Sequence, residues 1–397
     1  MGFDHDVVIA GGCGHVGLPL GLAFANRGLS VILYDIDDAA VGRVSRGEVP
    51  FREPGAAELL QRMLEDGRVE ATTDAVSVSA AESVVVVIGT PVDEHLNPKP
   101  EAVPRAIESY AHHLTDGQLL VLRSTVYPGV TALVESLVAR LDLDVDVAFC
   151  PERIAEGNAL VELYELPQLV AARAPKAAKR AELLFRQLTS EIVHLTPEEA
   201  ELAKLFTNTW RYIKFATANQ LFMIANEFGL DFERIRSALA HEYPRAADMP
   251  PAGFAAGPCL FKDTIQLAAF NNNNFTLGHA SVMINEGLPL YLVSKAQQRF
   301  ELSEMTVGIL GMAFKADSDD IRSSLSYKLK RILKFKAKAV LCTDPHVKTD
   351  DSLVALDEVL ARSDLLFIAT PHSEYRDLKV DVPVIDIWNL LGSGVLV

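Results

Sequence analysis

The sequence predicts an α/β protein in which two parallel-sheet domains flank a helical one. Over the first 195 residues, apolar runs of strand length alternate with helix-like stretches, which indicates a doubly wound parallel sheet covered on both faces. Residues 198–300 show helix-like periodicity and no convincing strand, whereas strand-like runs return at 305–310 and recur toward the end. We therefore expect domains at 1–195, 196–300 and 301–397.

The composition is that of a folded protein with an acidic surface. Hydrophobic residues make up 49% of the 397 positions, too many for a globally disordered chain. The net charge of −16 argues against nucleic acid as a partner, because nucleic-acid binding needs a basic footprint. No apolar run approaches the roughly 20 residues of a membrane span, so we expect no membrane partner.

The N-terminus and the cysteines predict a cytoplasmic protein. The first residues lack the basic start and the apolar run of a secretory signal. The four cysteines, Cys13, Cys150, Cys259 and Cys342, form no C-x-x-C pair, so neither a zinc site nor a disulfide framework is indicated. We expect reduced thiols and no bound metal, with one thiol available as a nucleophile.

The first domain begins with a strand–turn–helix–strand unit. An apolar run at 7–10 enters a glycine cluster, residues 18–27 are helix-like and end at Gly28, and a second apolar run at 30–34 ends at Asp35. Further strands are predicted at 84–88, 119–122, 147–150 and 168–171.

The glycine cluster has the pattern of a dinucleotide site, G-x-G-x-x-G between a strand and a helix. Its first glycine permits a tight turn, the second lets a pyrophosphate approach the backbone, and the third lets the helix pack on the strand. Asp35 is placed to bind a ribose hydroxyl and to repel a 2′-phosphate, so we expect NAD rather than NADP. The cofactor-binding residues predicted here are Gly12, Gly14, His15, Val16, Gly17 and Asp35.

A long helix is predicted to open the middle domain. Pro197-Glu198-Glu199 begins a helix-patterned stretch that runs to about Phe228, and the two glutamates would lie at its positive end. The run Asn271 to Asn274 is interpreted as a polar turn. The last domain is a smaller α/β unit, with strands predicted at 305–310, 338–342, 364–369 and 383–387.

Cys259 lies where a small-residue loop ending in Gly257-Pro258 passes into a helix-like stretch. The positive end of that helix and nearby Lys262 favour the thiolate, and Asp263, four residues on, would share the same helical face. Nucleophile and carboxylate would then face one cavity. From this segment alone, a buried structural cysteine is an equal alternative.

Two further pairs have i, i+4 spacing. Lys204 and Asn208 would lie on one helical face, where an ammonium and an amide can donate to an oxyanion. Glu152 and Glu156 follow a predicted strand, at the carboxyl end where α/β sheets hold ligands. The alternatives are a solvated lysine on an amphipathic helix and a surface glutamate pair bound to Arg153.

Ten short motifs occur in order along nearly the whole chain. They are Gly12 to Gly17, Glu53-Pro54-Gly55, Ala71-Thr72-Thr73-Asp74, Gly89-Thr90-Pro91, Ser124 to Gly129, Pro151-Glu152 with Glu156-Gly157, Lys204 with Asn208, the Cys259 loop, Gly311 to Lys315 with Asp319 to Arg322, and Asp344-Pro345. In this order they resemble the UDP-glucose/GDP-mannose dehydrogenase family. The resemblance implies two Rossmann-like domains joined by a long helix that also forms a homodimer interface, with NAD on the first domain and UDP on the last.

The resemblance also implies an NAD-dependent nucleotide-sugar 6-dehydrogenase. The family oxidises C6 of the sugar twice, from alcohol to aldehyde to acid, with two NAD and a thiohemiacetal and thioester on the residue matching Cys259. Lys204 and Asn208 would hold the oxyanion. Glu152 would be the general base for hydrolysis, with Thr125 and Asp263 placing the water.

The remaining site residues are matched to family positions. Glu156 would support the site, and Thr90, Thr125 and Arg322 lie at positions near NAD. Phe254, Gly257 and Lys315 lie at substrate-contacting positions, and Arg245 matches an arginine lent by the neighbouring subunit.

The sequence departs from the family on the substrate side. Ala256-Gly257-Pro258 stands for the usual Gly-Gly-Ser, Asp386-Ile387-Trp388-Asn389 for Asp-x-Arg-Asn, and Thr370-Pro371-His372 for Thr-Glu-Trp or Thr-Glu-His. UDP-glucose or another NDP-glucose is the first expected substrate and a UDP-N-acetylhexosamine the nearest alternative. A two-electron dehydrogenase or epimerase would leave Cys259 without a role. A non-catalytic NAD-binding protein would not need Cys259, Lys204 and Asp263 together.

Overall fold

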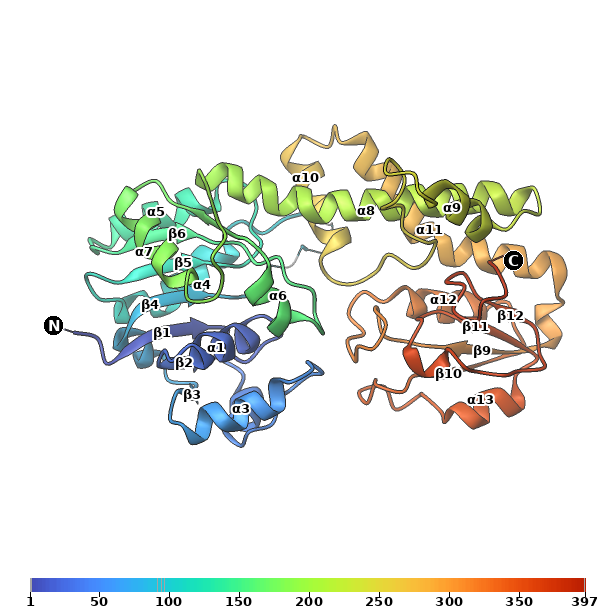
Figure 1. The fold of residues 1–397 in the computed structure, drawn as a ribbon, viewed down its shortest axis with the longest axis horizontal. Coiled ribbons are helices and arrows are strands. Elements are labelled where there is room, and N and C mark those ends of the chain that lie inside the picture. Colours follow the sequence, from blue (N-terminus) through green and yellow to red (C-terminus); the bar gives the residue numbers. More distant parts are fainter. Residues whose placement is uncertain (1, 91, 94, 96, 396) are drawn as a thin grey trace. The chain divides into compact units, whose positions relative to one another are not determined.

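The computed structural model describes residues 2–90, 92–93, 95, 97–395 and 397. The chain divides into two compact units, Met1–Phe206 and Thr207–Val397 (Figure 1). A long helix, α8 (Pro197–Glu227), begins in the first unit and continues into the second. Within the described residues, the first unit contains an eight-stranded sheet and the second a four-stranded sheet.

The larger sheet forms the centre of the first unit. Its strands are His5–Ala10 (β1), Val31–Tyr34 (β2), Val69–Thr72 (β3), Ala81–Val86 (β4), Leu119–Leu122 (β5), Asp146–Phe149 (β6), Gln168–Ala171 (β7) and Ile192–Leu195 (β8). They lie in the order β3-β2-β1-β4-β5-β6-β7-β8. The pairs from β3 to β6 are parallel as expected, whereas β7 runs antiparallel to β6. The antiparallel pair and the strands β3 and β8 were not anticipated.

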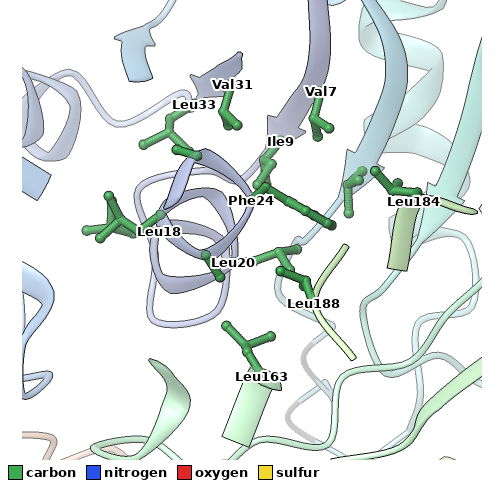
Figure 2. Packing of buried hydrophobic residues seen from close by; sticks show 14 of the residues in the cluster. Val7, Ile9, Leu18, Leu20, Phe24, Val31, Leu33, Leu163, Leu184 and Leu188 are labelled. Carbon is green, nitrogen blue, oxygen red and sulfur yellow. The ribbon is translucent and has the colours of Figure 1, made fainter. Parts of the chain in front are cut away.

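Helices cover both faces of this sheet. They are Gly17–Asn26 (α1), Asp38–Ser45 (α2), Ala56–Glu65 (α3), Ala102–Tyr110 (α4), Val130–Arg140 (α5), Ala159–Glu165 (α6) and Pro175–Phe185 (α7), with 3₁₀ helices at Ala75–Ala80 and Ala111–His113. Figure 2 shows Leu20 and Phe24 of α1 packed beside Ile9 of β1. The next residue of β1, Val8, belongs to a second buried cluster with Ile107 of α4. Successive strand residues point to opposite faces, so the sheet is doubly wound.

A capping box starts α8. Glu199 accepts from the Thr196 backbone N–H at 2.8 Å, and the Thr196 hydroxyl accepts from the Glu199 backbone N–H at 3.4 Å. One turn later the buried Glu201 carboxylate accepts from the backbone N–H groups of Gly129 and Thr131 at 2.6 and 2.8 Å. These donors lie at the N-terminus of α5, where a carboxylate is stabilised. The start of α8 is therefore fastened to the first unit.

Three more helices follow α8, namely Phe232–Ala240 (α9), Leu260–Phe270 (α10) and Thr276–Arg299 (α11), and the described residues of this stretch form no strand. Asn271–Asn274 forms the turn between α10 and α11, with Asn272 and Asn273 at positive φ. Among the described helices, none has both the length and the apolar character that crossing a bilayer requires.

The smaller sheet has the strands Thr306–Leu310 (β9), Ala339–Thr343 (β10), Leu365–Ile368 (β11) and Val384–Ile385 (β12). All its pairs are parallel, in the order β10-β9-β11-β12. The accompanying helices are Leu325–Lys334 (α12) and Leu356–Arg362 (α13), with 3₁₀ helices at Leu302–Glu304 and Ser373–Tyr375. The predicted strands of this smaller α/β unit are therefore confirmed.

Asp344 closes the turn that follows β9. Its buried carboxylate accepts from the backbone N–H groups of Met312 and Ala313 at 2.6 and 2.9 Å and lies 3.0 Å from the His372 Nε2. Burial alone would raise the pKa of Asp344, but the hydrogen bond with His372, the attraction of that ring and the backbone N–H groups hold it well below its ordinary range. Ionised Asp344 therefore fixes the loop that leads to Lys315.

We predict that Asp344→Asn destabilises the protein by at least about 3 kcal/mol at pH 7, because the buried donors lose their carboxylate. A lowered folded pKa gives stability that is complete above the unfolded pKa of about 4 and is lost as the pH falls through the folded pKa. The gap in urea midpoint between variant and wild type should therefore narrow below about pH 4. Asp351→Asn, at an exposed neighbour, is the control. Equal midpoints at pH 7 would contradict this role.

Candidate active site

The glycine turn between β1 and α1 is open at one of its glycines. A Cβ on Gly12 would lie 2.7 Å from the Leu33 α-carbon, and one on Gly17 would lie 2.2 Å from the Gly11 carbonyl oxygen, so backbone closes both positions. A Cβ on Gly14 would meet only the Gly11 oxygen, at 3.9 Å. The open face at Gly14 is what the approach of a pyrophosphate needs, so the turn fits NAD.

Asp35 lies directly after β2 and holds this turn. Its Oδ2 accepts from the Cys13 backbone N–H at 3.0 Å. The side chain is half-buried, which leaves it access to a ribose. The His15 ring stacks on Phe51 with 4.2 Å between centroids, and Val16 is the N-cap residue of α1. The structure therefore brings all six predicted cofactor residues to one turn and the end of β2.

The loops after β4 and β5 are joined by two hydrogen bonds. The Thr90 hydroxyl donates to the Thr125 carbonyl at 2.6 Å, and the Ser124 hydroxyl accepts from the Ile88 backbone N–H at 2.8 Å. Both threonines are half-buried at the carboxyl edge of the sheet, where α/β proteins bind ligands. Pro91, the last residue of the Gly89-Thr90-Pro91 motif, lies outside the described residues.

Glu152 follows β6 and is held by a buried arginine. Its Oε2 is ion-paired with the Arg123 guanidinium, and its Oε1 accepts from the backbone N–H groups of Arg153 and Ile154 at 2.6 and 2.9 Å. Arg123 also donates to the Gln168 side chain at 3.0 Å. The alternative of a surface glutamate bound to the Arg153 side chain is not what the structure shows. Sequence reasoning missed Arg123, whose partner Glu152 is distant along the chain.

Glu53 positions the loop that contains Glu156. Its buried carboxylate accepts from the backbone N–H groups of Gly157 and Ala159, each at 2.8 Å. Ala159 begins α6, so the carboxylate also lies at a positive helix end. The Glu53-Pro54-Gly55 motif thus has a structural role that its sequence pattern alone did not indicate. Glu156 is half-buried in the loop that Glu53 holds.

Cys259 is the exposed thiol among the four cysteines, so the alternative of a buried structural residue does not hold. It is the N-cap residue of α10 and therefore lies at the positive end of that helix. Burial raises the pKa of Cys13 and of Cys150 to about 12 and that of Cys342 to about 11. Those three thiols stay protonated at neutral pH, which leaves Cys259 as the accessible candidate for a nucleophile.

Asp263 lies one turn after Cys259 and binds a residue of α8. The Asn208 amide donates to the Asp263 Oδ2 at 2.6 Å, and both side chains are buried. The other oxygen accepts no hydrogen bond from the described residues and lies 3.7 Å from the Lys262 ammonium. An amide has two N–H groups, so Asn208 keeps one for an oxyanion. Lys204 is buried and lies one turn before Asn208 on α8.

The loop before Cys259 is shaped by aromatic rings. Phe254 is buried, and Gly257 has φ +98°, in the region that favours glycine. A Cβ on Gly257 would lie 2.6 Å from the Phe314 ring. The packing of the loop therefore requires glycine at position 257, and the substrate contact that the resemblance implies for Gly257 stays a prediction.

Three further predicted residues lie in the second unit. Arg245 is exposed between α9 and α10 and donates to the Tyr243 hydroxyl at 3.1 Å. Lys315 is half-buried in the loop after β9. Arg322 precedes α12, and its guanidinium is paired with Asp320 at 2.6 Å. The predicted residues are therefore divided between the two units.

One group of potential metal ligands occurs in the second unit. Asp317, His346, His372 and Glu374 bring ligand atoms within 4.8 Å of one another. The two ring nitrogens of His372 are engaged, however, by Asp344 and by the Asp317 backbone N–H, and the His346 Nε2 lies 3.1 Å from the Glu374 carboxylate. The side chains satisfy one another, and we assign no metal to them.

We predict that Gly14→Ala folds as stably as the wild type but binds NAD at least about tenfold more weakly, because its methyl group occupies the space for the pyrophosphate. Gly17→Ala is the matched comparison and should lower the urea midpoint, since its methyl group would overlap backbone. Calorimetric titration with NAD measures the first effect. Equal affinities of Gly14→Ala and wild type would contradict the placement of the cofactor.

Comparison with known families accounts for nearly the whole chain. Its three parts match the NAD-binding domain of the UDP-glucose/GDP-mannose dehydrogenase family at residues 6–189, the central domain at 198–286 and the UDP-binding domain at 308–393. The first match confirms the prediction of NAD, and the third supports a nucleotide-sugar substrate.

Individual relatives cover the chain almost completely. The UDP-N-acetyl-D-mannosamine dehydrogenase of Pyrococcus horikoshii is 30% identical over 396 residues, which cover 96% of this chain and 91% of the relative. The solved structure of that organism's UDP-D-ManNAc dehydrogenase has a TM-score of 0.89 at 27% identity, covering 97% and 96% of the two chains. A UDP-glucose dehydrogenase from Pyrobaculum islandicum has a TM-score of 0.88 at 27% identity, covering 96% and 94%. With a shared fold, three matching domains and this identity, the chain belongs to the UDP-glucose/GDP-mannose dehydrogenase family.

Proposed function

We propose that this protein is a nucleotide-sugar 6-dehydrogenase that oxidises C6 from alcohol to acid. The observation that carries the proposal is the exposed Cys259 thiol at the start of α10, followed one turn later by the buried Asp263–Asn208 pair. A dehydrogenase that stops at the aldehyde needs no nucleophile, whereas oxidation to the acid benefits from one that holds the aldehyde carbon. An NAD-binding protein without catalysis needs none of these residues.

The first oxidation converts the C6 alcohol to an aldehyde. NAD supplies the hydride acceptor for this oxidation and, as a second molecule, for the next one. Gly14 and Asp35 are proposed to hold the pyrophosphate and the ribose, where the open face of the turn and the half-buried carboxylate favour them. Thr90 and Arg322 are proposed as further contacts to the cofactor. C6 loses a hydride, and its hydroxyl loses a proton.

Cys259 then forms a bond from its sulfur to C6 of the aldehyde, and the carbonyl oxygen takes up a proton to give a thiohemiacetal. Loss of a hydride from C6 and of the hydroxyl proton leaves a thioester. The Lys204 ammonium and the second N–H of Asn208 are proposed to stabilise the charge on the C6 oxygen. Asp263 fixes the orientation of the Asn208 amide through their 2.6 Å hydrogen bond.

Hydrolysis of the thioester completes the reaction. Glu152 is proposed to take a proton from a water molecule whose oxygen attacks C6, so that the carbon–sulfur bond breaks and Cys259 leaves as thiolate. The Arg123 ion pair and two backbone N–H groups support this role because they hold the carboxylate in one orientation. Thr125 and Asp263 are proposed to place the water, and Glu156 to support the loop.

The comparisons favour a UDP-linked N-acetylhexosamine as the substrate. Relatives found by sequence and by structure are named for UDP-N-acetyl-D-mannosamine, and one structure is named for UDP-glucose. We therefore place UDP-N-acetyl-D-mannosamine ahead of UDP-glucose, the reverse of the order that the motifs suggested. Phe254, Gly257 and Lys315 are proposed to contact the nucleotide sugar.

We predict that two NADH form for each sugar oxidised. UDP-N-acetyl-D-mannosamine and UDP-glucose are tested side by side, with NADH measured by absorbance and the acid by chromatography. Cys259→Ala should form acid at least about 10³-fold more slowly, because the nucleophile is lost. Cys342→Ala removes a buried thiol and should keep the two-to-one ratio. A ratio of one NADH per sugar, or acid formation by Cys259→Ala at the wild-type rate, would refute the four-electron reaction.

We also propose that the protein is a homodimer. Large apolar side chains are exposed on the helices of the second unit. Examples are Trp210 of α8, Phe228 just after α8 and Met283 of α11, and Phe228 and Met283 are each 76% exposed. Where such side chains form a contiguous patch, they mark an interaction surface. The exposed Arg245 is proposed to complete the site of the partner, as the family resemblance implies.

We predict that Arg245→Ala and Cys259→Ala homodimers are each nearly inactive and that mixing them after mild dissociation restores up to about one quarter of wild-type activity. Random reassociation would place an intact Cys259 beside a partner with an intact Arg245 in one site of each mixed dimer. Light scattering establishes the dimer. A monomer with full activity, or no gain on mixing two proteins that form mixed dimers, would contradict the shared site.

A further inference from the structure

One buried amide, that of Asn219, binds both the N–H and the carbonyl of Gly253. The Asn219 side chain accepts from the Gly253 N–H at 2.9 Å and donates to the Gly253 carbonyl at 3.0 Å. Asn219 also donates to the buried Asn285 side chain at 3.0 Å, and Asn285 donates to the Tyr212 carbonyl at 3.1 Å. Buried amides with these partners have little freedom, so the loop that leads to Cys259 is fixed to α8 at Gly253.

The Trp388 indole lies against the free face of this glycine. A Cβ on Gly253 would come within 2.2 to 2.5 Å of three carbons of the ring. The indole Nε1–H donates to the Ala369 carbonyl just after β11 at 3.2 Å, and the Trp388 backbone N–H donates to Asp386 at 3.1 Å. These bonds fix the plane of the ring and use its single polar group. The indole therefore offers the loop a rigid apolar support.

The distance along the chain from this support to the thiol is short. Five residues lie between Gly253 and Cys259, and the first two of them, Phe254 and Ala255, are buried. At the far end, Gly257 lies against the Phe314 ring. The segment is thus supported at both ends by rings that follow strands of the smaller sheet, Trp388 after β12 and Phe314 after β9.

We propose that Trp388 is a positioning residue for the nucleophile, through Gly253 and the loop to Cys259. The proposal rests on the proposed function, in which Cys259 attacks C6. A side chain without a flat apolar face at position 388 would leave the Gly253 backbone unsupported on the side opposite Asn219. The thiol would then lose its fixed place at the N-terminus of α10, where the helix favours the thiolate.

Alkylation of Cys259 by iodoacetamide, without substrate, tests the position of the thiol independently of activity. Cys259 is the exposed cysteine, and its modification is followed by peptide mass. Trp388→Ala should slow alkylation at neutral pH at least about threefold, because the displaced thiol loses the favourable helix end. It should also lower kcat about 10²-fold, the effect of a misplacement of about 1 Å. NAD affinity should be unchanged.

The controls separate positioning from general stability. Trp388→Phe keeps a ring against Gly253 and should restore most of the alkylation rate, although it loses the bond to Ala369. Phe335→Ala removes an aromatic ring that is 88% exposed in the same unit and should alter neither rate. A wild-type alkylation rate in Trp388→Ala would overturn the proposal whatever the activity. If the variants show the expected alkylation rates but the wild type oxidises no nucleotide sugar, the result counts against the proposed function alone.

A double-substitution cycle tests the contact itself. Gly253→Ala should slow alkylation in the wild-type background, because its methyl group overlaps the indole. The backbone strain from φ +156° is the same in both backgrounds and cancels in the cycle. Gly253→Ala should therefore slow alkylation less in Trp388→Ala than in wild type. If the two fold-changes in rate simply multiply in the double variant, Gly253 and Trp388 act separately, and the proposal is refuted.

Discussion

The hydrogen bond from the Asn208 amide to the buried Asp263 carboxylate fixes where the Cys259 thiol lies. Asn208 is on α8 and Asp263 on the first turn of α10, so one bond ties the start of α10 to the long helix. Leaving such a carboxylate buried without its partner would cost about 3–5 kcal/mol, which keeps the two helices together. Separately, Glu201 fastens the start of α8 to α5 within the first unit.

In each sheet, a carboxylate closes a glycine turn. The residue after the first strand is a glycine with positive φ, Gly11 or Gly311, and the carboxylate after the adjacent strand closes the turn. Asp35 accepts from one backbone N–H and stays half-buried, so it remains available to a ribose. Asp344 is buried and bonds to His372 and to several backbone N–H groups. The same arrangement therefore leaves the carboxylate half-buried in the first unit and buries it in the second.

The sequence alone predicted those parts of the fold and site whose residues lie close together along the chain. Buried strands, the long helix and the glycine turn all follow from apolar periodicity or fixed intervals. The strands β3 and β8 were missed because they are short edge strands whose residues are mostly only partly buried. The antiparallel direction of β7 was missed because an apolar run carries no information on strand direction. Arg123 and Trp388 escaped for another reason. Each acts through a partner distant along the chain, Glu152 or Gly253, and that proximity exists only in the folded protein.

The covalent role of Cys259 is tested most directly by trapping the acyl group on it. Glu152→Gln is mixed with NAD and UDP-N-acetyl-D-mannosamine or UDP-glucose, quenched in acid and analysed by intact and peptide mass. Arg123 keeps its bonds to the Cys150 carbonyl and Gln168, which supports the variant's fold. Loss of the proposed base should slow hydrolysis roughly 10²–10⁴-fold, so the nucleotide-sugar acyl group should accumulate on the Cys259 peptide after two NADH per site. Two NADH per site with no added mass on Cys259 would contradict the account.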